Sequence, residues 1–225
     1  MQRKFVFSVD EYYHVYNRGV DKRVVFVEDK DYFRFIRLLY ICNSSEPVVM
    51  KELQSLSDKE FFNFKKGEEL VYLGAYCLMP NHFHLLIKEK TENGIALFLK
   101  KVLTAYSMYF NKKYERRGLL FERPYQATHL DDDIYLNYIY AYIHLNPVKL
   151  IDHDWKEKGI TSLRKTKDFL AGYRYSSYLD FIGIEREEAK ILRKKVFPEY
   201  FSDKKEFDDF ISEWLNFQGL SLESF

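Results

Sequence analysis

Two histidines separated by one residue give the sequence its clearest chemical signal. His82 and His84 stand on either side of Phe83 in an otherwise apolar stretch. Alternate side chains of a β-strand point to the same face, so a strand here presents both imidazoles together. Polar rings in an apolar strand cost stability unless they are partnered, and one shared divalent metal ion is such a partner. Ordinary packed or surface histidines also form pairs of this kind, so the metal interpretation needs support from other residues.

A second group of residues supplies that support. Tyr142 and Asn146 are four residues apart, which places both side chains on one face of a helix, one turn apart. The amide oxygen of Asn146 can serve as a third ligand beside the two imidazoles. This donor set predicts Mg²⁺ or Mn²⁺, with Zn²⁺ as a further option, and leaves positions for phosphate oxygens. The alternative is that Tyr142 is a core aromatic residue and Asn146 a helix cap.

A local basic segment follows the histidines, although the net charge of the chain is only +1. Tyrosine and phenylalanine residues are interleaved with its cations, and phosphate contacts plus stacking rings suit single-stranded or hairpin nucleic acid. The alternative is a solvated helix face with extended lysines. The cations predicted to contact DNA are Lys112, Lys113, Arg116, Arg117 and Arg123, together with Lys149 just past Asn146.

Hydrophobic periodicity indicates the elements that must position these groups. Strands are predicted at residues 12–18, 71–78, 82–88 and 125–129, with a hairpin turn at 79–81. Helices are predicted at 31–43, 93–114 and from the aspartates at 131–133 to residue 145, and residues 44–69 resemble an insertion with a short helix. This order predicts an α+β fold, in which helices pack on an antiparallel sheet.

The character of the chain changes after Leu150. A polar and basic stretch at 152–167 is followed by an aromatic one, and helices are predicted near 185–196 and 204–217. We therefore expect a catalytic domain at residues 1–150 and a mainly helical C-terminal extension at residues 151–225. Trp155 and Trp214 are expected to anchor this extension.

Composition limits the class of protein. Hydrophobic residues make up 47% of the chain, enough for a substantial core, and aromatic residues make up 18%, which suits either core packing or base stacking. Cys42 and Cys77 lack metal-type spacing and resemble reduced core thiols. No signal peptide or membrane-spanning stretch is evident. We expect a cytoplasmic protein without membrane association.

Four motifs resemble the single-tyrosine HUH transposases, and among them the REP-associated tyrosine transposases most closely. They are HVYNRG at 14–19, MPNHFH at 79–84, FERPYQA at 121–127 and YIHLNPVK at 142–149. The resemblance covers roughly residues 8 to 150. The part of the chain after about Tyr178 has no clear counterpart in the family. The resemblance implies a bacterial protein with a ferredoxin-like or RRM-like sheet and the histidine pair on a central strand.

By position, the resemblance implies that His82, His84 and Asn146 are the metal ligands and Tyr142 the nucleophile. Some relatives carry glutamine where this chain has Asn146. The resemblance also suggests that Asn17 and Arg18, in the first-strand motif, touch DNA near the site. His14, in the same motif, is expected to be a packed or surface residue outside the site.

These residues predict metal-dependent nicking and joining of single-stranded or hairpin DNA. Attack by Tyr142 would give a 5′-phosphotyrosine and a 3′-hydroxyl, and a second 3′-hydroxyl would reverse the reaction. Tyr138, one turn earlier, is the rival nucleophile. Two other functions stay open: a non-catalytic hairpin-binding protein on the same fold, and a metal hydrolase using the two histidines and an acidic residue such as one of the aspartates at 131–133. The protein is expected at the nucleoid when bound to DNA, as a monomer or a homodimer.

Overall fold

The computed structural model describes residues 6–47, 49–53 and 55–216, and a four-stranded antiparallel sheet lies at its centre. The strands are β1 (Tyr12–Arg18), β2 (Val71–Met79), β3 (His82–Glu89) and β4 (Gln126–His129), in the spatial order β2-β3-β1-β4. Two helices, α1 (Asp29–Ile41) and α3 (Gly94–Lys113), connect the strands in the sequence β1-α1-β2-β3-α3-β4. This is the ferredoxin-like arrangement, so the predicted α+β fold is confirmed.

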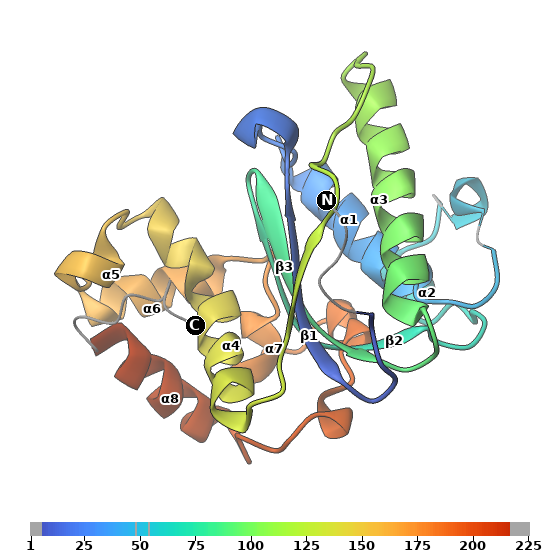
Figure 1. Cartoon of the computed structure of the whole chain (residues 1–225). Helices are drawn as coiled ribbons and strands as arrows, with labels where there is room; N and C mark the ends of the chain where they lie inside the picture. The colour runs from blue at the N-terminus through green and yellow to red at the C-terminus, as the bar shows by residue number, and fades with distance from the viewer. Residues whose placement is uncertain (1–5, 48, 54, 217–225) are drawn as a thin grey trace.

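The two faces of the sheet carry different residues because the side chains alternate along each strand. Tyr13 and Val15 of β1 and Phe83 and Leu85 of β3 are buried in one core, together with residues of α1 and α3. Figure 1 shows α1 and α3 on this side of the sheet and α4, α5, α6 and α8 on the other. The histidine pair therefore belongs to the face on which α4 lies.

The start of α3 depends on a close approach that only glycine allows. A Cβ atom at Gly94 would lie 2.2 Å from the carbonyl oxygen of Leu70, which precedes β2. Glu89, at the end of β3, is fully buried and accepts a hydrogen bond from the backbone N–H of Ile95 at 2.7 Å. The first turn of α3 is thus fixed against the sheet on both sides.

The second face of the sheet is covered by α4 (Asp133–Leu145), which continues as a 3-10 helix, η3 (Asn146–Leu150). The side chain of Asp132 accepts a hydrogen bond from the backbone N–H of Tyr135, so the aspartates cap the helix as predicted. Ile139 and Ile143 pack in one cluster with Ala75 and Leu86 of the sheet. The helix is therefore held with a fixed rotation over β2 and β3.

The remaining elements are short in the N-terminal part and mainly helical after residue 150. They are η1 (Val20–Lys22), η2 (Met50–Leu53), α2 (Asp58–Phe61), α5 (Trp155–Lys158), α6 (Leu163–Gly172), α7 (Tyr178–Phe181), η4 (Glu187–Ile191), η5 (Lys194–Val196) and α8 (Lys204–Asn216). The predicted helix at 204–217 corresponds to α8, with Phe217 outside the described residues. Trp155 is buried, and Trp214 contacts the ring of Tyr138, so both tryptophans join the C-terminal segment to α4.

The prediction of one continuous helix at 185–196 is wrong. Between η4 and η5, Leu192 is extended and forms a parallel bridge with Leu73 of β2, and the Arg193 N–H donates to the Leu73 carbonyl at 2.8 Å. Further along β2, the N–H of Ser177 donates to the carbonyl oxygen of Tyr76 at 2.9 Å. The C-terminal segment thus pairs with the outer edge of β2, whose backbone groups need partners.

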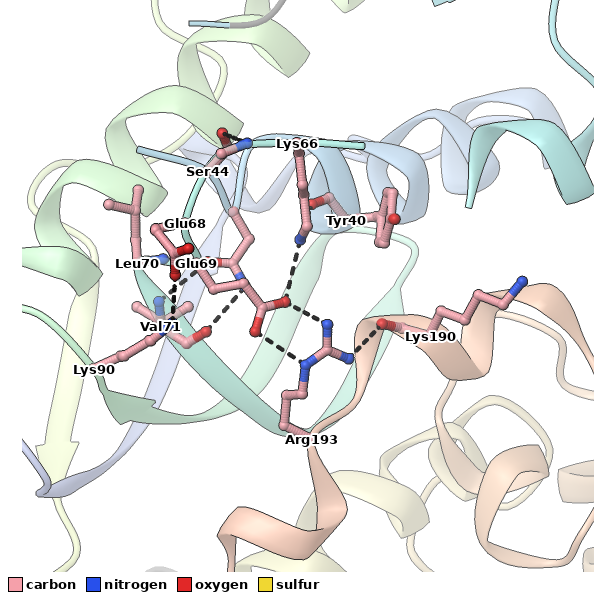
Figure 2. A network of polar contacts seen from close by, with 12 residues as sticks. Tyr40, Ser44, Lys66, Glu68, Glu69, Leu70, Val71, Lys90, Lys190 and Arg193 are labelled. Carbon is pink, nitrogen blue, oxygen red and sulfur yellow. Dashed lines mark hydrogen bonds and ion pairs between the residues drawn. The ribbon is translucent and has the colours of Figure 1, made fainter. Parts of the chain in front are cut away.

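An ion-pair network attaches the same segment to the insertion before β2 (Figure 2). Arg193 Nε donates to Glu69 Oε2 at 3.0 Å, and Lys66 Nζ donates to the carbonyl oxygen of Tyr40 at 2.9 Å and to Glu69 Oε1 at 3.3 Å. Glu69 therefore links α1, the insertion and the C-terminal segment.

Among the described residues, no helix is both long and apolar enough to cross a membrane.

Candidate active site

The imidazoles of His82 and His84 lie side by side on the α4 face of β3. Their ring centroids are 5.0 Å apart and their planes are perpendicular. Phe83 between them points into the opposite core, where its ring contacts Phe35. The antiparallel register places Arg18 opposite His82 and Tyr16 opposite His84, so both β1 residues are immediate neighbours of the pair.

Hydrogen bonds at Nδ1 determine which nitrogen of each ring can bind a metal. His82 Nδ1 lies 2.6 Å from Asn81 Oδ1, an atom that only accepts, so Nδ1 carries the proton and Nε2 keeps its lone pair. His84 Nδ1 lies 2.9 Å from Nε2 of His14. When Nδ1 of His84 donates in this contact, its Nε2 atom has the lone pair as well. Both rings can then present Nε2 to one ion.

The electrostatic surroundings keep both rings neutral. Burial lowers the pKa of His82 to about 4, and the charges of Arg18 and Lys149 act in the same direction. Burial also holds the pKa of His84 well below its usual range, with further contributions from His14, His82 and nearby lysines. A neutral imidazole is the form that binds metal, so the pair is ready for ligation at neutral pH.

Tyr142 of α4 reaches the histidines directly. Its ring meets His84 edge-on at 5.2 Å between centroids and His14 at 5.4 Å. Burial raises the pKa of the Tyr142 phenol, and a neighbouring tyrosine, Tyr16, adds to this, whereas a side-chain hydrogen bond with Asn146 opposes it. The hydroxyl therefore stays protonated at neutral pH.

Asn146 lies one turn beyond Tyr142 and is buried. Its Nδ2 atom donates to the backbone carbonyl oxygen of Tyr142 at 2.7 Å. This bond orients the amide and leaves Oδ1 as the atom that a metal ion would use. The structure thus places the predicted nucleophile near the end of α4 and the third predicted ligand at the start of η3, with Tyr142 against the histidine pair.

His14 is part of this site, although sequence reasoning left it out. It is buried against His84, its ring stacks on Tyr16 at 5.1 Å between centroids, and burial lowers its pKa to about 3. A signal was present in the sequence: His14, Tyr16 and Arg18 alternate along one strand and so share a face. That pattern does not say which face, because the pairing of β1 with β3 sets it.

The rival tyrosine packs against other aromatic rings. Tyr138 is buried one turn earlier on α4, and its ring lies 5.1 Å from Trp214 and 5.9 Å from Tyr142 between centroids. Burial raises the pKa of its phenol strongly. Tyr140 points to the other side, where its ring contacts Phe181 and Tyr200. Of these tyrosines, Tyr142 has the ring contacts with His84 and His14.

The cations among the predicted DNA-contacting residues fall into two groups. Arg18 lies opposite His82 in the strand register, and the charges of Arg18 and Lys149 both lower the pKa of His82. The others lie at the end of α3 and in the loop after it, on the opposite helical layer. Of these, Lys112, Arg117 and Arg123 are exposed, and Arg116 donates to Asn111 Oδ1 at 3.0 Å.

Two further predicted contact residues, Lys113 and Asn17, also have structural partners. The Lys113 ammonium pairs with Glu28 at 2.8 Å and with the fully buried Asp31. The Asn17 side chain donates to the carbonyl oxygen of Glu122 at 3.1 Å and accepts from the Arg18 N–H at 2.9 Å. Asn17 thereby attaches the loop after α3 to β1. A cavity of about 690 Å³ opens beside it, with Arg123 and Lys100 in its lining.

A carboxylate-based metal centre has no counterpart in the described part of the chain. Across residues 6–47, 49–53 and 55–216, no group of three or more His, Cys, Asp or Glu side chains could hold a metal ion. Asp132 caps α4, and Asp133 accepts a hydrogen bond from the Tyr200 hydroxyl. A metal centre at the histidine pair would therefore rely on the amide oxygen of Asn146.

The fold and the site together define a ferredoxin-like protein with a histidine pair facing a helical tyrosine. The profile of the IS200-like transposase family matches residues 34–146, just over half of the 225 residues. The chain belongs to the IS200-like transposase family. The matched range includes His82, His84, Tyr142 and Asn146, whereas His14 precedes it.

A solved structure, that of a REP-associated tyrosine transposase bound to a REP hairpin, is similar to this chain. The superposition has a TM-score of 0.50 at 11% sequence identity and covers 90% of this chain and 95% of the other. At this identity the likeness shows a shared fold. Comparison with curated proteins gave no match.

Proposed function

We propose that this transposase-family protein nicks and rejoins single-stranded DNA through a covalent 5′-phosphotyrosine on Tyr142. One observation carries the proposal: the Tyr142 ring lies 5.2 Å from that of His84, on the face where His82 and His84 stand together. The proposed nucleophile, from a helix, and the two proposed ligand rings, from the central strand, meet there. We further propose that residues 1–150 form the catalytic domain and residues 151–225 its extension.

The donor set fits a divalent metal ion, which we propose to be Mg²⁺ or Mn²⁺ in the cell. His82 and His84 would each offer Nε2, because Asn81 and His14 occupy the Nδ1 atoms. Asn146 would offer Oδ1, since its Nδ2 atom is bonded to the Tyr142 carbonyl. A bound ion would supply Lewis-acid polarisation of the scissile phosphate.

The proposed reaction exchanges one phosphodiester for another. The Tyr142 oxygen attacks the phosphorus and loses its proton, the bond from phosphorus to the 3′ oxygen breaks, and that oxygen leaves as a 3′-hydroxyl after taking up a proton. The buried phenol is a weak nucleophile while protonated, so positioning against the phosphate matters. A second 3′-hydroxyl reverses the step and joins strands without hydrolysis.

The proposed substrate is hairpin-forming single-stranded DNA. The structurally similar transposase binds a REP hairpin, which supports this choice. Arg18 and Lys149 lie at the histidine pair, where phosphate would enter, and the exposed cations after α3 would contact the flanking strand. The protein would act in the cytoplasm at the nucleoid, as a monomer or a homodimer.

The proposal is tested by incubating the protein and Mn²⁺ with labelled hairpin-containing single strands. Wild type should yield a DNA–protein adduct that survives denaturation, and a cleaved strand with a 3′-hydroxyl end. EDTA should abolish both products. Tight hairpin binding without cleavage would replace the proposal with a binding module, and metal-dependent cleavage without an adduct would replace it with a hydrolase.

A further inference from the structure

The face of the sheet that carries the histidine pair extends onto β1 and β4. Residues opposite each other on antiparallel strands point to the same face, so Tyr16 shares its face with His84 of β3 and with Gln126 of β4. Helix α4 packs over β2 and β3, whereas Arg18 and Gln126 are exposed and Tyr16 is half-buried. We call Tyr16, Arg18 and Gln126 the β1–β4 surface. It lies directly beside the proposed metal ligands.

Tyr16 gives this surface an aromatic ring at the site. The ring stacks on that of His14, with 5.1 Å between centroids and 29° between planes, and lies 5.7 Å from the ring of His84. Tyr16 also contributes to raising the pKa of Tyr142, which shows that the two phenols are close to each other. His14 is buried and supports one side of the ring, and the half-buried ring keeps part of its surface accessible.

The chemistry of the β1–β4 surface suits an unpaired nucleotide. Aromatic side chains on a four-stranded sheet are a common platform for unpaired bases, and every base has a flat face that can stack on them. Arg18, two residues further along β1, adds a cation for phosphate. The Gln126 side chain donates to the carbonyl oxygen of Pro124 at 3.2 Å, which holds its amide on the neighbouring strand. A ring, a cation and an amide beside the proposed site of phosphate transfer favour nucleic acid as the occupant.

We propose that Tyr16 stacks on an unpaired base next to the scissile phosphate and thereby holds the DNA strand at Tyr142. This inference rests on the proposed function, since it names a contact to the same substrate. The base and the phosphate of one nucleotide are joined through a single sugar, so fixing the base restricts where the phosphate can lie. That restriction lowers the entropy cost of bringing the phosphorus to the Tyr142 oxygen. A paired base is stacked within its duplex, so the contact selects single-stranded DNA at the cleavage position.

The first test measures binding of a labelled hairpin with a single-stranded flank, in EDTA so that no strand is cleaved. Tyr16→Leu removes the ring and should weaken binding by about 5- to 150-fold, the range for the loss of one base–aromatic stack. Tyr16→Phe keeps the ring and should bind within about twofold of wild type. Tyr12→Leu is the matched control, because Tyr12 lies on the same face of β1 but packs against Phe197, with 5.4 Å between ring centroids. This control should also bind within about twofold of wild type.

The second test removes the base instead of the ring. An abasic nucleotide is moved through the flank one position at a time, and one position should weaken binding to the wild-type protein. At that position Tyr16→Leu should cause no further loss, because the base and the ring form a single contact. Adduct formation with Mn²⁺ maps the cleaved bond, and the sensitive position should adjoin it.

The inference is overturned by an unchanged affinity of Tyr16→Leu, or by a loss of the same size at every abasic position. It is also overturned by a Tyr16→Phe loss as large as that of Tyr16→Leu, which would assign the effect to the hydroxyl, or by a sensitive position away from the cleaved bond. If the hairpin binds with the expected base dependence but forms no adduct with wild-type protein, the proposed function alone is contradicted.

Discussion

Nε2 of His14 lies 2.9 Å from Nδ1 of His84, a contact between neighbouring central strands on the face that carries Tyr142. When His84 Nδ1 donates in this contact, His14 Nε2 is the acceptor, and the bond fixes the orientation of the His84 ring and leaves the lone pair on its Nε2 atom. A hydrogen bond to the ring nitrogen that does not bind the metal orients a histidine ligand and makes it a stronger ligand. His14 would therefore act on metal binding without being a ligand itself.

Replacing His14 should weaken metal binding. His14→Ala removes the acceptor for His84, so Mn²⁺ affinity measured by calorimetry should fall by about 10- to 100-fold. His129→Ala is the matched control, because His129 is on the adjacent strand and pairs with Glu11 instead. Unchanged Mn²⁺ affinity in His14→Ala would show that the contact has no part in metal binding.

Changing Asn146 to aspartate should strengthen metal binding. A carboxylate oxygen is a better ligand for Mg²⁺ and Mn²⁺ than an amide oxygen, so Asn146→Asp should bind Mn²⁺ more tightly than wild type and Asn146→Ala more weakly. Calorimetric titration with Mn²⁺ measures the affinity. Thermal unfolding of each variant without metal shows separately how much stability is lost with the hydrogen bond from Asn146 to the Tyr142 carbonyl. Weaker Mn²⁺ binding in a stably folded Asn146→Asp would remove Asn146 from the ligand set.

Asp31 should dominate the acid sensitivity of the fold. Its buried carboxylate accepts hydrogen bonds from Lys113, Tyr109, Tyr114 and the backbone of Val27, and these lower its pKa although burial alone would raise it. A lowered pKa means that the stabilisation is fully present above the unfolded value of about 3.9 and is lost as pH falls through the folded pKa.

Asp31→Asn should lower the free energy of unfolding by about 1–3 kcal/mol at pH 7, because it removes a buried charged acceptor of several hydrogen bonds, whereas the Lys113 ammonium keeps its pair with Glu28. The deficit should shrink as pH falls below about 4, because the carboxyl of Asp31 takes up a proton in the unfolded state there while the folded state keeps its charge to lower pH. Urea unfolding of wild type and Asp31→Asn, at pH 7 and again below about pH 4, measures this difference in the free energy of unfolding. Asp58→Asn is the control: this exposed partner of Arg37 should change stability by less than about 1 kcal/mol. A deficit independent of pH would contradict this account.

The spacing of apolar residues correctly predicted the strands and helices that bury one face in the core. Strand β1 begins and ends where the aromatic and β-branched run does, and α4 follows its aspartate cap and periodic apolar residues. Helix α6 was not predicted, since only Thr166 and Leu170 are buried along it and its sequence is polar. The prediction of a helix at 185–196 is wrong for a different reason, because pairing with the edge of β2 competes with helix formation there.

The site was predictable where its residues share one element. The spacing of His82 with His84, and of Tyr142 with Asn146, shows in each case that two side chains share a face. His14 and Tyr16 reach the site through the register of β1 with β3, which depends on residues far away in the chain. That relationship exists only in the folded molecule.

The most direct test of the central claim is to identify the residue that carries DNA. Wild-type protein, reacted with Mn²⁺ and a hairpin strand, would be digested with nuclease and protease, and the nucleotide-bearing peptide sequenced by mass spectrometry. We predict a 5′-phosphonucleotide on Tyr142, absent in Tyr142→Phe and retained in Tyr138→Phe. A nucleotide on Tyr138 or on any other residue would contradict the assignment of Tyr142 as the nucleophile.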